Sequence, residues 1–406
     1  MYLTEEEELM LAGDYGEAVK LSMEILTGIG HVYEAERLVP VRSVHAGCAY
    51  PNFQASVELM EKFAELGGKF RTTTTVNPRL NPHNVDLWGD LQEPEELKLA
   101  NIRQNRAIEQ MGVIPNWSCT PYFEGNLPRF GEAISWVESS AIVYANSVIG
   151  ARTNRTTIGV DIASAITGRV PEFGLFLSGN RAGEVLVKVE FQPKNMFDYN
   201  NIGFIIGKTC NGKVPVIEGL PSSATVNELK VMGAAAATRG GIALYHAVGI
   251  TPEARTRAEA FKGKKPVYEL TIQEKDIKAA VEEMNSIKGG KIDAVLMGCP
   301  YPSVGDIQEL AVLLNGKKIR QDIMFCLFAS SNTINYAREL GYNEVLENSG
   351  VKIFEGDCIV SHSVQAWGWK NIATNSAKCA CTVSPAPTHL DVLYTDIKEC
   401  VQLATI

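Results

Sequence analysis

The last third of the chain, from about residue 292 onward, constrains the fold most, because short apolar runs alternate there with amphipathic ones. The apolar runs are typical of buried strands, since they are short, rich in β-branched and aromatic residues and bounded by turn residues. Alternation of this kind predicts a parallel sheet covered by helices. The runs are IDAVLMG, VGDIQELAVLLN, DIMFCLFAS, SNTINYARELG, VKIFEGDC, NIATNSAKCA and DVLYTDIKECVQLA.

The first part of the chain also alternates, and it carries helix-start and helix-stop signals. Thr4 precedes an acidic first turn and Gly13 follows the apolar period, so we expect a capped helix between them. Ser303 and Asp306 form the same kind of start farther on. The run SVELMEKFAELGG is typical of a helix, and VPVRSV and KFRTTTTV are typical of strands.

The middle of the chain, from about Glu132 to Pro252, is rich in glycine and small residues. Such runs occur where backbones approach closely, either at a ligand site or in tight helix packing, and both interpretations stay open. A lysine-rich stretch, KGKKPVYELTIQEKD, suggests a boundary near 275. We therefore expect α/β domains over 1–130 and 276–406, and a middle domain rich in small residues over 131–275.

Charge and hydropathy exclude several classes of protein. The net charge is -9 at pH 7, so a basic face for nucleic acid is not expected. No apolar stretch reaches the roughly 20 residues of a membrane span, and MYLTEEEE lacks the basic start of a signal peptide. We expect a cytoplasmic protein that binds neither nucleic acid nor membrane.

The nine cysteines are dispersed, without a C-x-x-C pair. In a chain of 406 residues, free thiols or metal ligands are expected rather than disulfides. The spacing of Cys379 and Cys381 alternates as in a strand, and a zinc ribbon is poorly supported. Most of these cysteines are expected to be small buried hydrophobic residues.

Three cysteines differ from the rest because each lies in turn-like sequence. Cys119 and Cys299 are followed closely by proline, and Cys358 follows Gly-Asp at a strand end. Proteins with open parallel sheets bind their ligands in a crevice outside the carboxyl ends of the strands. Three thiolates meeting there could hold an iron-sulfur cluster and leave one iron open as a Lewis acid. A catalytic thiol is the rival interpretation.

Two polar motifs offer anion sites with equally ordinary alternatives. Arg152 and Arg155 of ARTNR can bind a carboxylate or phosphate, or simply form a solvated helix end. In TNSAK, Thr374 or Asn375 can cap a helix whose free N–H groups, with Lys378, attract an anion. Ordinary capping is the commoner case.

Other signals are weaker. Thr75 and Asn77 of TTTTVNP can face a ligand or belong to an exposed strand, and His246 is expected to be a hydrogen-bonded interior group. Neither G-x-G-x-x-G between strand and helix nor a P-loop motif occurs, which favours metal or cluster chemistry over a nucleotide cofactor.

Taken in order, the motifs resemble the large, catalytic subunit of the aconitase X family. They are MYLTEEEELMLAGDYGEA, TTTTVNP, CTPY, ESSAIVYANSVIGARTNR, GCPYPS, EGDC and NSAK, and the likeness extends from Met1 to the final helix. The resemblance implies an aconitase-like fold, with three α/β domains of mostly parallel sheets around a central iron-sulfur cluster, either 4Fe-4S or 2Fe-2S. A separate small subunit would supply a fourth, swivelling domain.

The resemblance also implies an activity and site residues. The activity would be a hydro-lyase acting on a small 3-hydroxy carboxylate, with cis-3-hydroxy-L-proline as the leading substrate and phosphomevalonate as the alternative. The catalytic base would lie on the small subunit. By motif match, the cluster ligands are Cys119, Cys299 and Cys358; the substrate-binding residues are Asn77, Ser139, Ser140, Arg152 and Arg155; and Ser376 and Lys378 belong to the catalytic site.

The sequence departs from the family pattern at three places. Relatives commonly have histidine where Tyr301 follows GCP, a His-Leu-Asp-Glu-Asn-Arg type segment where FLSGNR contains Phe176 and Arg181, and Ala-His-Tyr after NSAK where this chain has CACT. These changes concern the substrate more than the cluster. A non-catalytic iron-sulfur or metabolite-binding protein, and a metal-free enzyme with Cys299 as nucleophile, are the alternative functions.

Overall fold

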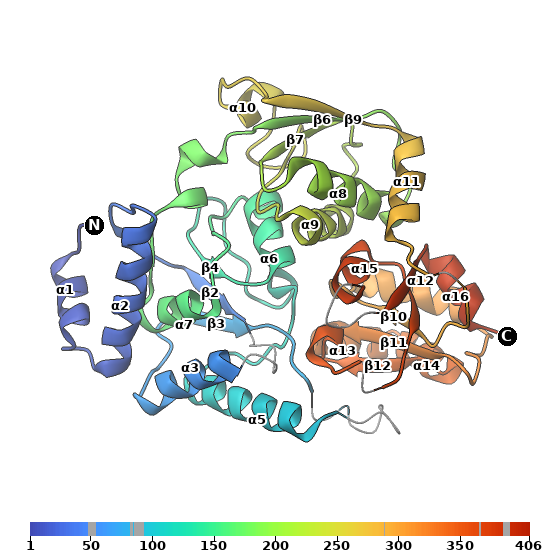
Figure 1. Ribbon diagram of the computed structural model, residues 1–406, viewed down its shortest axis with the longest axis horizontal. Helices are drawn as coiled ribbons and strands as arrows, with labels where there is room; N and C mark the ends of the chain where they lie inside the picture. The colour runs from blue at the N-terminus through green and yellow to red at the C-terminus, as the bar shows by residue number, and fades with distance from the viewer. Residues whose placement is uncertain (48–53, 82–83, 85–92, 288, 365–366, 385–389) are drawn as a thin grey trace. The chain divides into compact units, whose positions relative to one another are not determined.

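The computed structural model describes residues 1–47, 54–81, 84, 93–287, 289–364, 367–384 and 390–406, and Figure 1 shows its helices and strands. The contacts along the chain define two units. The first comprises Met1–Asn77, Glu95–Glu184 and Ala243–Val267, and the second comprises Pro78–Pro94, Val185–Ile242 and Tyr268–Ile406.

The helices of the first unit begin with the predicted capped helix. Thr4 Oγ1 accepts from Glu7 N at 3.3 Å, Glu7 Oε2 accepts from Thr4 N at 2.9 Å, and Gly13 ends the helix with a φ of 100°, as predicted. The helical segments are α1 (Glu5–Ala12), α2 (Glu17–Val32), α3 (Gln54–Glu65), α5 (Glu95–Gln110), η2 (Pro121–Phe123), α6 (Ser139–Tyr144), η3 (Ala145–Ile149), α7 (Ile158–Thr167), η4 (Gly174–Phe176), η5 (Ser178–Arg181) and α10 (Arg257–Phe261).

The sheet of the first unit is parallel, in the order β3-β2-β4. Its strands are β2 (Ser43–Ala46), β3 (Thr73–Val76) and β4 (Ser135–Trp136), and β8 (His246–Ala247) also belongs to this unit. The predicted single strand VPVRSV is instead two, because β1 (Leu38–Pro40) pairs antiparallel with β5 (Arg169–Pro171) before β2 begins. Proline ends β1, since it has no N–H to continue a ladder.

In the second unit, a parallel sheet carries β6 between β7 and β9. The elements here are β6 (Val185–Val189), α8 (Met196–Cys210), β7 (Pro215–Glu218), α9 (Val226–Gly240), β9 (Tyr268–Ile272) and α11 (Glu274–Met284). Helices α8 and α9 pack closely: a Cβ at Gly203 would lie 2.1 Å from Met232 O, and one at Gly240 would lie 1.7 Å from Gly207 O. The run VMGAAAATRGG therefore serves helix packing.

The predicted alternation in the last third is confirmed as a five-stranded parallel sheet in the order β12-β11-β10-β13-β14. Its elements are β10 (Ala294–Met297), α12 (Val304–Leu314), β11 (Met324–Ala329), α13 (Ser331–Glu339), α14 (Tyr342–Ser349), β12 (Lys352–Glu355), η6 (Ile359–Ser361), β13 (Asn371–Thr374), α15 (Ala377–Val383), β14 (Asp391–Tyr394) and α16 (Ile397–Ala404). Because β13 lies on the other side of β10 from β11, the strand order reverses between β10 and β13. Ligands bind at such reversals.

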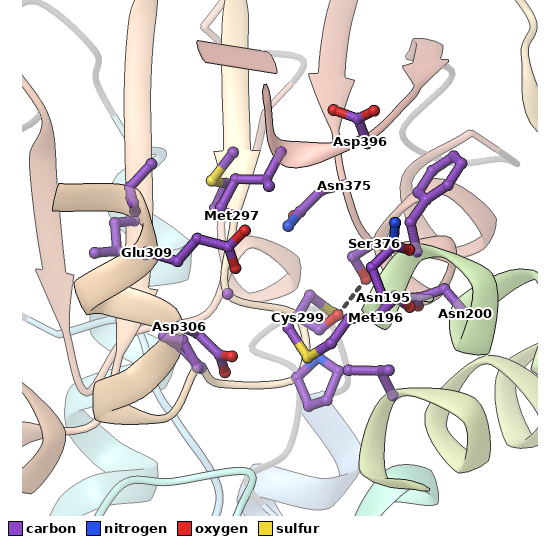
Figure 2. A pocket seen from close by; sticks show the side chains of 18 of the residues that line it. Asn195, Met196, Asn200, Met297, Cys299, Asp306, Glu309, Asn375, Ser376 and Asp396 are labelled. Carbon is purple, nitrogen blue, oxygen red and sulfur yellow. Dashed lines mark hydrogen bonds between the residues drawn. The ribbon is translucent and has the colours of Figure 1, made fainter. Parts of the chain in front are cut away.

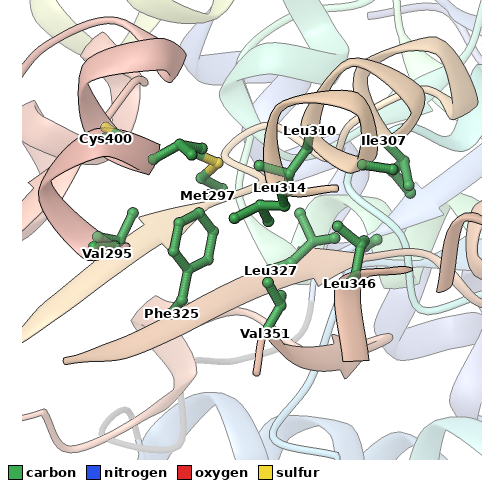
Figure 3. Close-up of a cluster of buried hydrophobic side chains, with 14 of the residues drawn as sticks. Val295, Met297, Ile307, Leu310, Leu314, Phe325, Leu327, Leu346, Val351 and Cys400 are labelled. Atoms are coloured by element: carbon green, nitrogen blue, oxygen red, sulfur yellow. The ribbon is translucent and has the colours of Figure 1, made fainter. Parts of the chain in front are cut away.

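One face of this sheet forms an apolar core with α12, α13, α14 and α16 (Figure 3). Val295 and Phe325 are fully buried on the sheet, and Ile307 and Leu314 pack against them from α12. Each such side chain stabilises the folded chain by about 1.5–3 kcal/mol through burial. The core therefore holds the carboxyl ends of β10 and its neighbours in a fixed order.

The predicted α/β fold with mostly parallel sheets is confirmed. The domain boundaries near 130 and 275 stay predictions. The expected strand through Cys379 and Cys381 is wrong, because both residues lie in α15, where the side chain of Ser376 caps the helix. The eight cysteines that the structure describes are free thiols, and Cys48 lies outside the described residues. Within the described ranges, no helix is long and apolar enough to cross a membrane.

Candidate active site at the carboxyl ends of the strands

The turn that carries Cys299 follows β10 through a glycine that no other residue can replace. Gly298 has a φ of 100°, and a Cβ there would lie 1.9 Å from Phe328 O. The backbone thus passes directly over β11 before reaching Cys299, which is half-buried. This close approach explains why the strand ends in Gly-Cys-Pro.

Cys358 comes from the turn after β12, and it shares a small cavity with Cys299. The cavity is otherwise lined by Leu296, Met297, Gly298, Phe328, Ile359 and Cys379. The structure thus brings the strand-end cysteines Cys299 and Cys358 together at the carboxyl edge of the parallel sheet, and their role as ligands stays a prediction. Sulfur atoms in an apolar setting provide soft ligands for iron.

Ser376 lies beside Cys299 at the reversal between β10 and β13 (Figure 2). Its hydroxyl donates to the carbonyl oxygen of Cys299 and accepts from Cys379 N at 3.0 Å, as the N-cap of α15. Lys378 is half-buried on the same helix. The NSAK motif therefore supports the Cys299 turn, and the catalytic roles of Ser376 and Lys378 stay predictions.

A larger pocket of about 210 Å³ opens next to Cys299 and Ser376 (Figure 2). Three carboxylates line it, from Asp306, Glu309 and Asp396, together with Lys230, Lys398 and the amides of Asn195, Asn200 and Asn375. Burial, together with Asp306 and Asp396, raises the pKa of Glu309 above its usual range. The buried Lys230 donates to Tyr301 O at 2.8 Å and lies 3.8 Å from Asp306. Acidic side chains thus outnumber basic ones in this pocket.

A buried histidine lies between two carboxylates beside the Cys358 turn. His362 Nδ1 is 2.8 Å from Glu93 Oε1, and Nε2 is 2.9 Å from Asp357 Oδ1. Burial alone would lower the pKa of His362, but the two carboxylates outweigh it and raise that pKa to about 9. The imidazole is therefore positively charged at neutral pH and donates to both acids.

In the first unit, the carboxyl ends of β2 and β3 place His45 against Asn77. His45 Nε2 is 2.9 Å from Asn77 Oδ1, and Nδ1 is 2.8 Å from Thr75 Oγ1, which in turn accepts from Asn126 Nδ2. Burial lowers the pKa of His45 to about 4, against the effect of the Asn77 hydrogen bond. A neutral ring that donates to Asn77 and accepts from Thr75 fixes the orientation of the Asn77 amide.

Cys119 lies near the same edge, because Ser118 N donates to Val76 O at the end of β3. Cys119 is 8% exposed and is followed by the η2 turn of CTPY. The first unit therefore brings the predicted ligand Cys119 close in the fold to the strand that presents Asn77.

Ser139 and Ser140 begin α6, and their hydroxyls both donate to the Glu138 carboxylate. Glu138 also accepts from Ser140 N at 3.0 Å and Ala141 N at 3.3 Å, so it caps the helix. Its φ of 77° lies in the left-handed region, which costs a non-glycine residue about 1–3 kcal/mol. Strain of this size is typical of functional positions. Glu138 was not predicted from the sequence as a site residue, although it belongs to the ESSA motif.

The two arginines of ARTNR differ in setting. Arg152 is half-buried; it donates to Phe176 O and, at 2.8 Å, to Ser178 Oγ, whereas Arg155 is exposed. Phe176 and Arg181, both at the departure from the family pattern, are buried, and Arg181 binds Glu253 and Asn146. His246 Nε2 is 2.7 Å from Arg181 O, which confirms that it is a hydrogen-bonded interior group.

The predicted site residues thus fall into two sets. Asn77, Cys119, Ser139, Ser140, Arg152 and Arg155 belong to the first unit, and Cys299, Cys358, Ser376 and Lys378 belong to the second. Among the side chains that the structure describes, no group of three or more His, Cys, Asp or Glu forms a metal site. The three-cysteine ligand set therefore stays a prediction.

The fold and site define an α/β enzyme whose candidate groups lie at the carboxyl ends of parallel strands. The family models "Aconitase X first domain", "second domain" and "third domain" match residues 1–179, 183–282 and 292–406. The chain belongs to the aconitase X family, and it is a hydro-lyase of that type.

Relatives with established names agree with this assignment. The phosphomevalonate dehydratase large subunit of Thermococcus kodakarensis is 38% identical over 382 residues, which cover 94% of each chain. The cis-3-hydroxy-L-proline dehydratase of Pseudomonas aeruginosa is 31% identical over 404 residues, which cover 98% of this chain and 69% of that one. The crystal structure of Thermococcus kodakaraensis aconitase X in its holo-form superposes with a TM-score of 0.90 at 36% identity, over 100% of both chains.

Proposed function

We propose that this chain is the large subunit of an iron-sulfur-dependent dehydratase that eliminates water from a small 3-hydroxy carboxylate. The observation that carries the proposal is the shared cavity of Cys299 and Cys358 at the carboxyl edge of the sheet, next to a pocket that Ser376 lines. In the reaction, the carbon beside the carboxyl group loses a proton, the C–O bond at the next carbon breaks, and a double bond and water are formed.

The residues present fit an iron-sulfur cofactor. Cys299 and Cys358 supply two thiolates to one cavity with apolar walls, and the family resemblance adds Cys119 as the third ligand. When bound, a cluster with an open iron supplies Lewis-acid polarisation of the leaving hydroxyl. The Ser376 hydroxyl fixes the Cys299 carbonyl and so orients this ligand turn.

The remaining groups bind and orient the substrate. Arg152 and Arg155 are the cations proposed for its carboxylate, because a guanidinium pairs with a carboxylate through two parallel hydrogen bonds. The Glu138 carboxylate accepts from the Ser139 and Ser140 hydroxyls, so each of these oxygens keeps its lone pairs for a hydrogen bond from a substrate hydroxyl. We place the catalytic base on the small subunit.

The leading substrate is cis-3-hydroxy-L-proline, because acids outnumber bases in the 210 Å³ pocket. The ring ammonium of this amino acid is attracted by Asp306, Glu309 and Asp396. A phosphate ester would face the same carboxylates and be repelled. The volume is that of a small metabolite rather than a polymer.

Phosphomevalonate is the second candidate, supported by the names of similar proteins. The large subunits of that name from Thermococcus kodakarensis and Methanocaldococcus jannaschii are matched over 94% and 99% of their length, at 38% and 36% identity. The Pseudomonas aeruginosa relative extends well beyond the match, since only 69% of it is covered. Because the first two of these relatives are named large subunits, a separate small subunit is the partner that we propose for this chain.

The test is a direct assay of the two substrates. The chain is co-expressed anaerobically with a candidate small subunit, iron and sulfide are measured, and water elimination is followed with cis-3-hydroxy-L-proline and with phosphomevalonate. We expect iron, sulfide and turnover of the amino acid. Asp306→Asn should weaken use of the amino acid and leave the iron content unchanged, whereas Asp14→Asn, on a surface turn, is the matched control.

Three outcomes would decide against parts of this proposal. Turnover of phosphomevalonate alone would transfer the substrate assignment to the second candidate. Iron and sulfide without turnover of either compound would support a non-catalytic binding protein. A metal-free complex that loses activity when thiols are alkylated would support Cys299 as a nucleophile.

A further inference from the structure

The turns of Cys299 and Cys358 are joined by a buried hydrogen bond. Tyr301 lies two residues after Cys299, and its Oη donates to the main-chain oxygen of Asp357 at 2.5 Å. Asp357 directly precedes Cys358. Tyr301 is 1% exposed, and its own carbonyl accepts from the buried Lys230. The residue that departs from the family pattern therefore connects two candidate ligand turns.

The Asp357 carboxylate extends this connection in two directions. Its Oδ1 accepts from Cys358 N at 2.8 Å and from His362 Nε2 at 2.9 Å, and its Oδ2 accepts from Asn84 Nδ2 at 3.0 Å. His362 in turn donates from Nδ1 to Glu93 Oε1 at 2.8 Å. A ring that donates from both nitrogens is an imidazolium.

The far end of this chain of contacts is also fixed. Glu93 Oε2 accepts from Ser363 N at 2.9 Å, one residue beyond His362. The side chains of Glu93, Asp357 and His362 are fully buried. Aromatic rings surround the imidazole: the Phe354 and Trp367 centroids lie 6.3 and 4.9 Å from its own. Three polar side chains are therefore hydrogen-bonded to one another, out of water, beside the Cys358 turn.

Stability alone does not account for such an arrangement. Removing an ion from water costs several kcal/mol, and apolar residues of similar volume usually stabilise a core as well as a buried ion pair does. Buried charges that hold a ligand-bearing turn have a different effect, because they fix its orientation and the local potential.

We propose that Tyr301, Asp357, His362 and Glu93 are positioning residues that hold the Cys358 turn against the Cys299 turn. The inference rests on the proposed function, because it assigns these residues to an iron-sulfur ligand pair. It names a role for Tyr301 that the family pattern does not contain.

The test compares near-isosteric variants of the complex purified anaerobically with its small subunit. Tyr301→Phe removes one oxygen, Asp357→Asn and Glu93→Gln remove one charge each, and Ser349→Ala is the control. Ser349 is also buried in the second unit and donates to Leu314 O and Val345 O, away from the cysteine turns. Iron release to a chelator, the visible absorption spectrum and the reduction potential are measured for each, alongside the melting temperature.

We expect Tyr301→Phe and Asp357→Asn to release iron about 10-fold faster than the wild type or more. Glu93→Gln, which acts on the Cys358 turn only through His362, should release iron faster than the wild type by a smaller factor. Ser349→Ala should lower the melting temperature and change neither the release rate nor the potential. If Asp357→Asn and Glu93→Gln fail to fold, the iron-release rate of Tyr301→Phe alone tests the positioning role.

The outcomes separate this inference from the function on which it rests. If the wild type holds iron and sulfide but the variants match Ser349→Ala in release rate and potential, the positioning role is wrong and the proposed function stands. If the wild type binds no iron or sulfide under these conditions, the proposed function fails, and the positioning role fails with it.

Discussion

At the scale of single residues, two residues of this protein adopt states that are unfavourable in free energy. Glu138 adopts a left-handed φ of 77° in order to hold two serine hydroxyls, and His362 is ionised while fully buried. Glu138 begins the ESSA motif that holds two predicted binding residues, and His362 lies four residues beyond the predicted ligand Cys358. Strain and buried charge of this kind concentrate at functional sites.

Asp161 is a buried acid outside these motifs, and it gives a pH-dependent prediction. Burial raises its pKa to about 7 although Ser135 and Thr156 donate to it, so the folded chain favours the neutral acid. Since the unfolded chain ionises near pH 4, this residue makes stability fall as pH rises from about 4 to 7. Asp161→Asn should therefore stabilise the chain at pH 8 by about 1–3 kcal/mol, and by little at pH 4.

Urea unfolding at pH 4, 6 and 8 checks this prediction. Asp322→Asn is the contrast, because Arg320 and Lys291 lower the pKa of Asp322 to about 2, and its loss should destabilise the chain at neutral pH. An Asp161→Asn variant no more stable than the wild type at pH 8 would contradict the assignment of a neutral buried acid.

At the scale of elements, close contact between two helix backbones explains the run of small residues, for which composition allowed either a ligand site or tight packing. The small-residue run of α9 has its reason in α8, where Gly203 and Gly207 let the two helices approach. Strands of the last third, the capping boxes and the covering helices were all predictable, because periodicity and caps act locally. The Cys379–Cys381 segment was not, since two residues at alternating positions do not distinguish a strand from a short helix.

Gly203→Ala tests this close packing. The new Cβ would lie 2.1 Å from Met232 O, so we expect a loss of stability of about 1–3 kcal/mol or more in urea unfolding. Gly28→Ala, in α2, is the matched control, because Gly28 is exposed and nothing lies within 4 Å of the position that an added methyl group would take. That substitution should stabilise the chain by about 0.5–1 kcal/mol. Equal effects of the two would show that α8 and α9 are less tightly packed.

At the scale of the whole molecule, the candidate site draws on segments far apart in sequence. The fold class could be predicted from alternation, and the cysteines from their turns, but Glu93, His362 and His45 could not. Glu93 is separated from His362 by 269 positions, and no local sequence pattern predicts a contact between residues so far apart. The roles of these residues can be recognised only in the folded chain, where the sheet brings their segments together.

The ligand set gives a prediction at this scale. If Cys119 of the first unit completes the set, then Cys119→Ser should lose as much iron as Cys358→Ser. Cys326→Ser, a buried cysteine of β11 whose burial raises the pKa of its thiol, should keep its iron. Iron and sulfide content of the anaerobically purified variants is the measurement. Full iron content in Cys119→Ser would restrict the ligands to the second unit.

The insertion of β13 beside β10, after β11 and β12 have been added on the other side, has a consequence for biosynthesis. Ser376, which supports the Cys299 turn, follows that late strand, so this support can form only after synthesis has passed residue 376. The Cys299 turn, at which we propose that the iron-sulfur cluster binds, then reaches its final geometry only after β13 has joined the sheet.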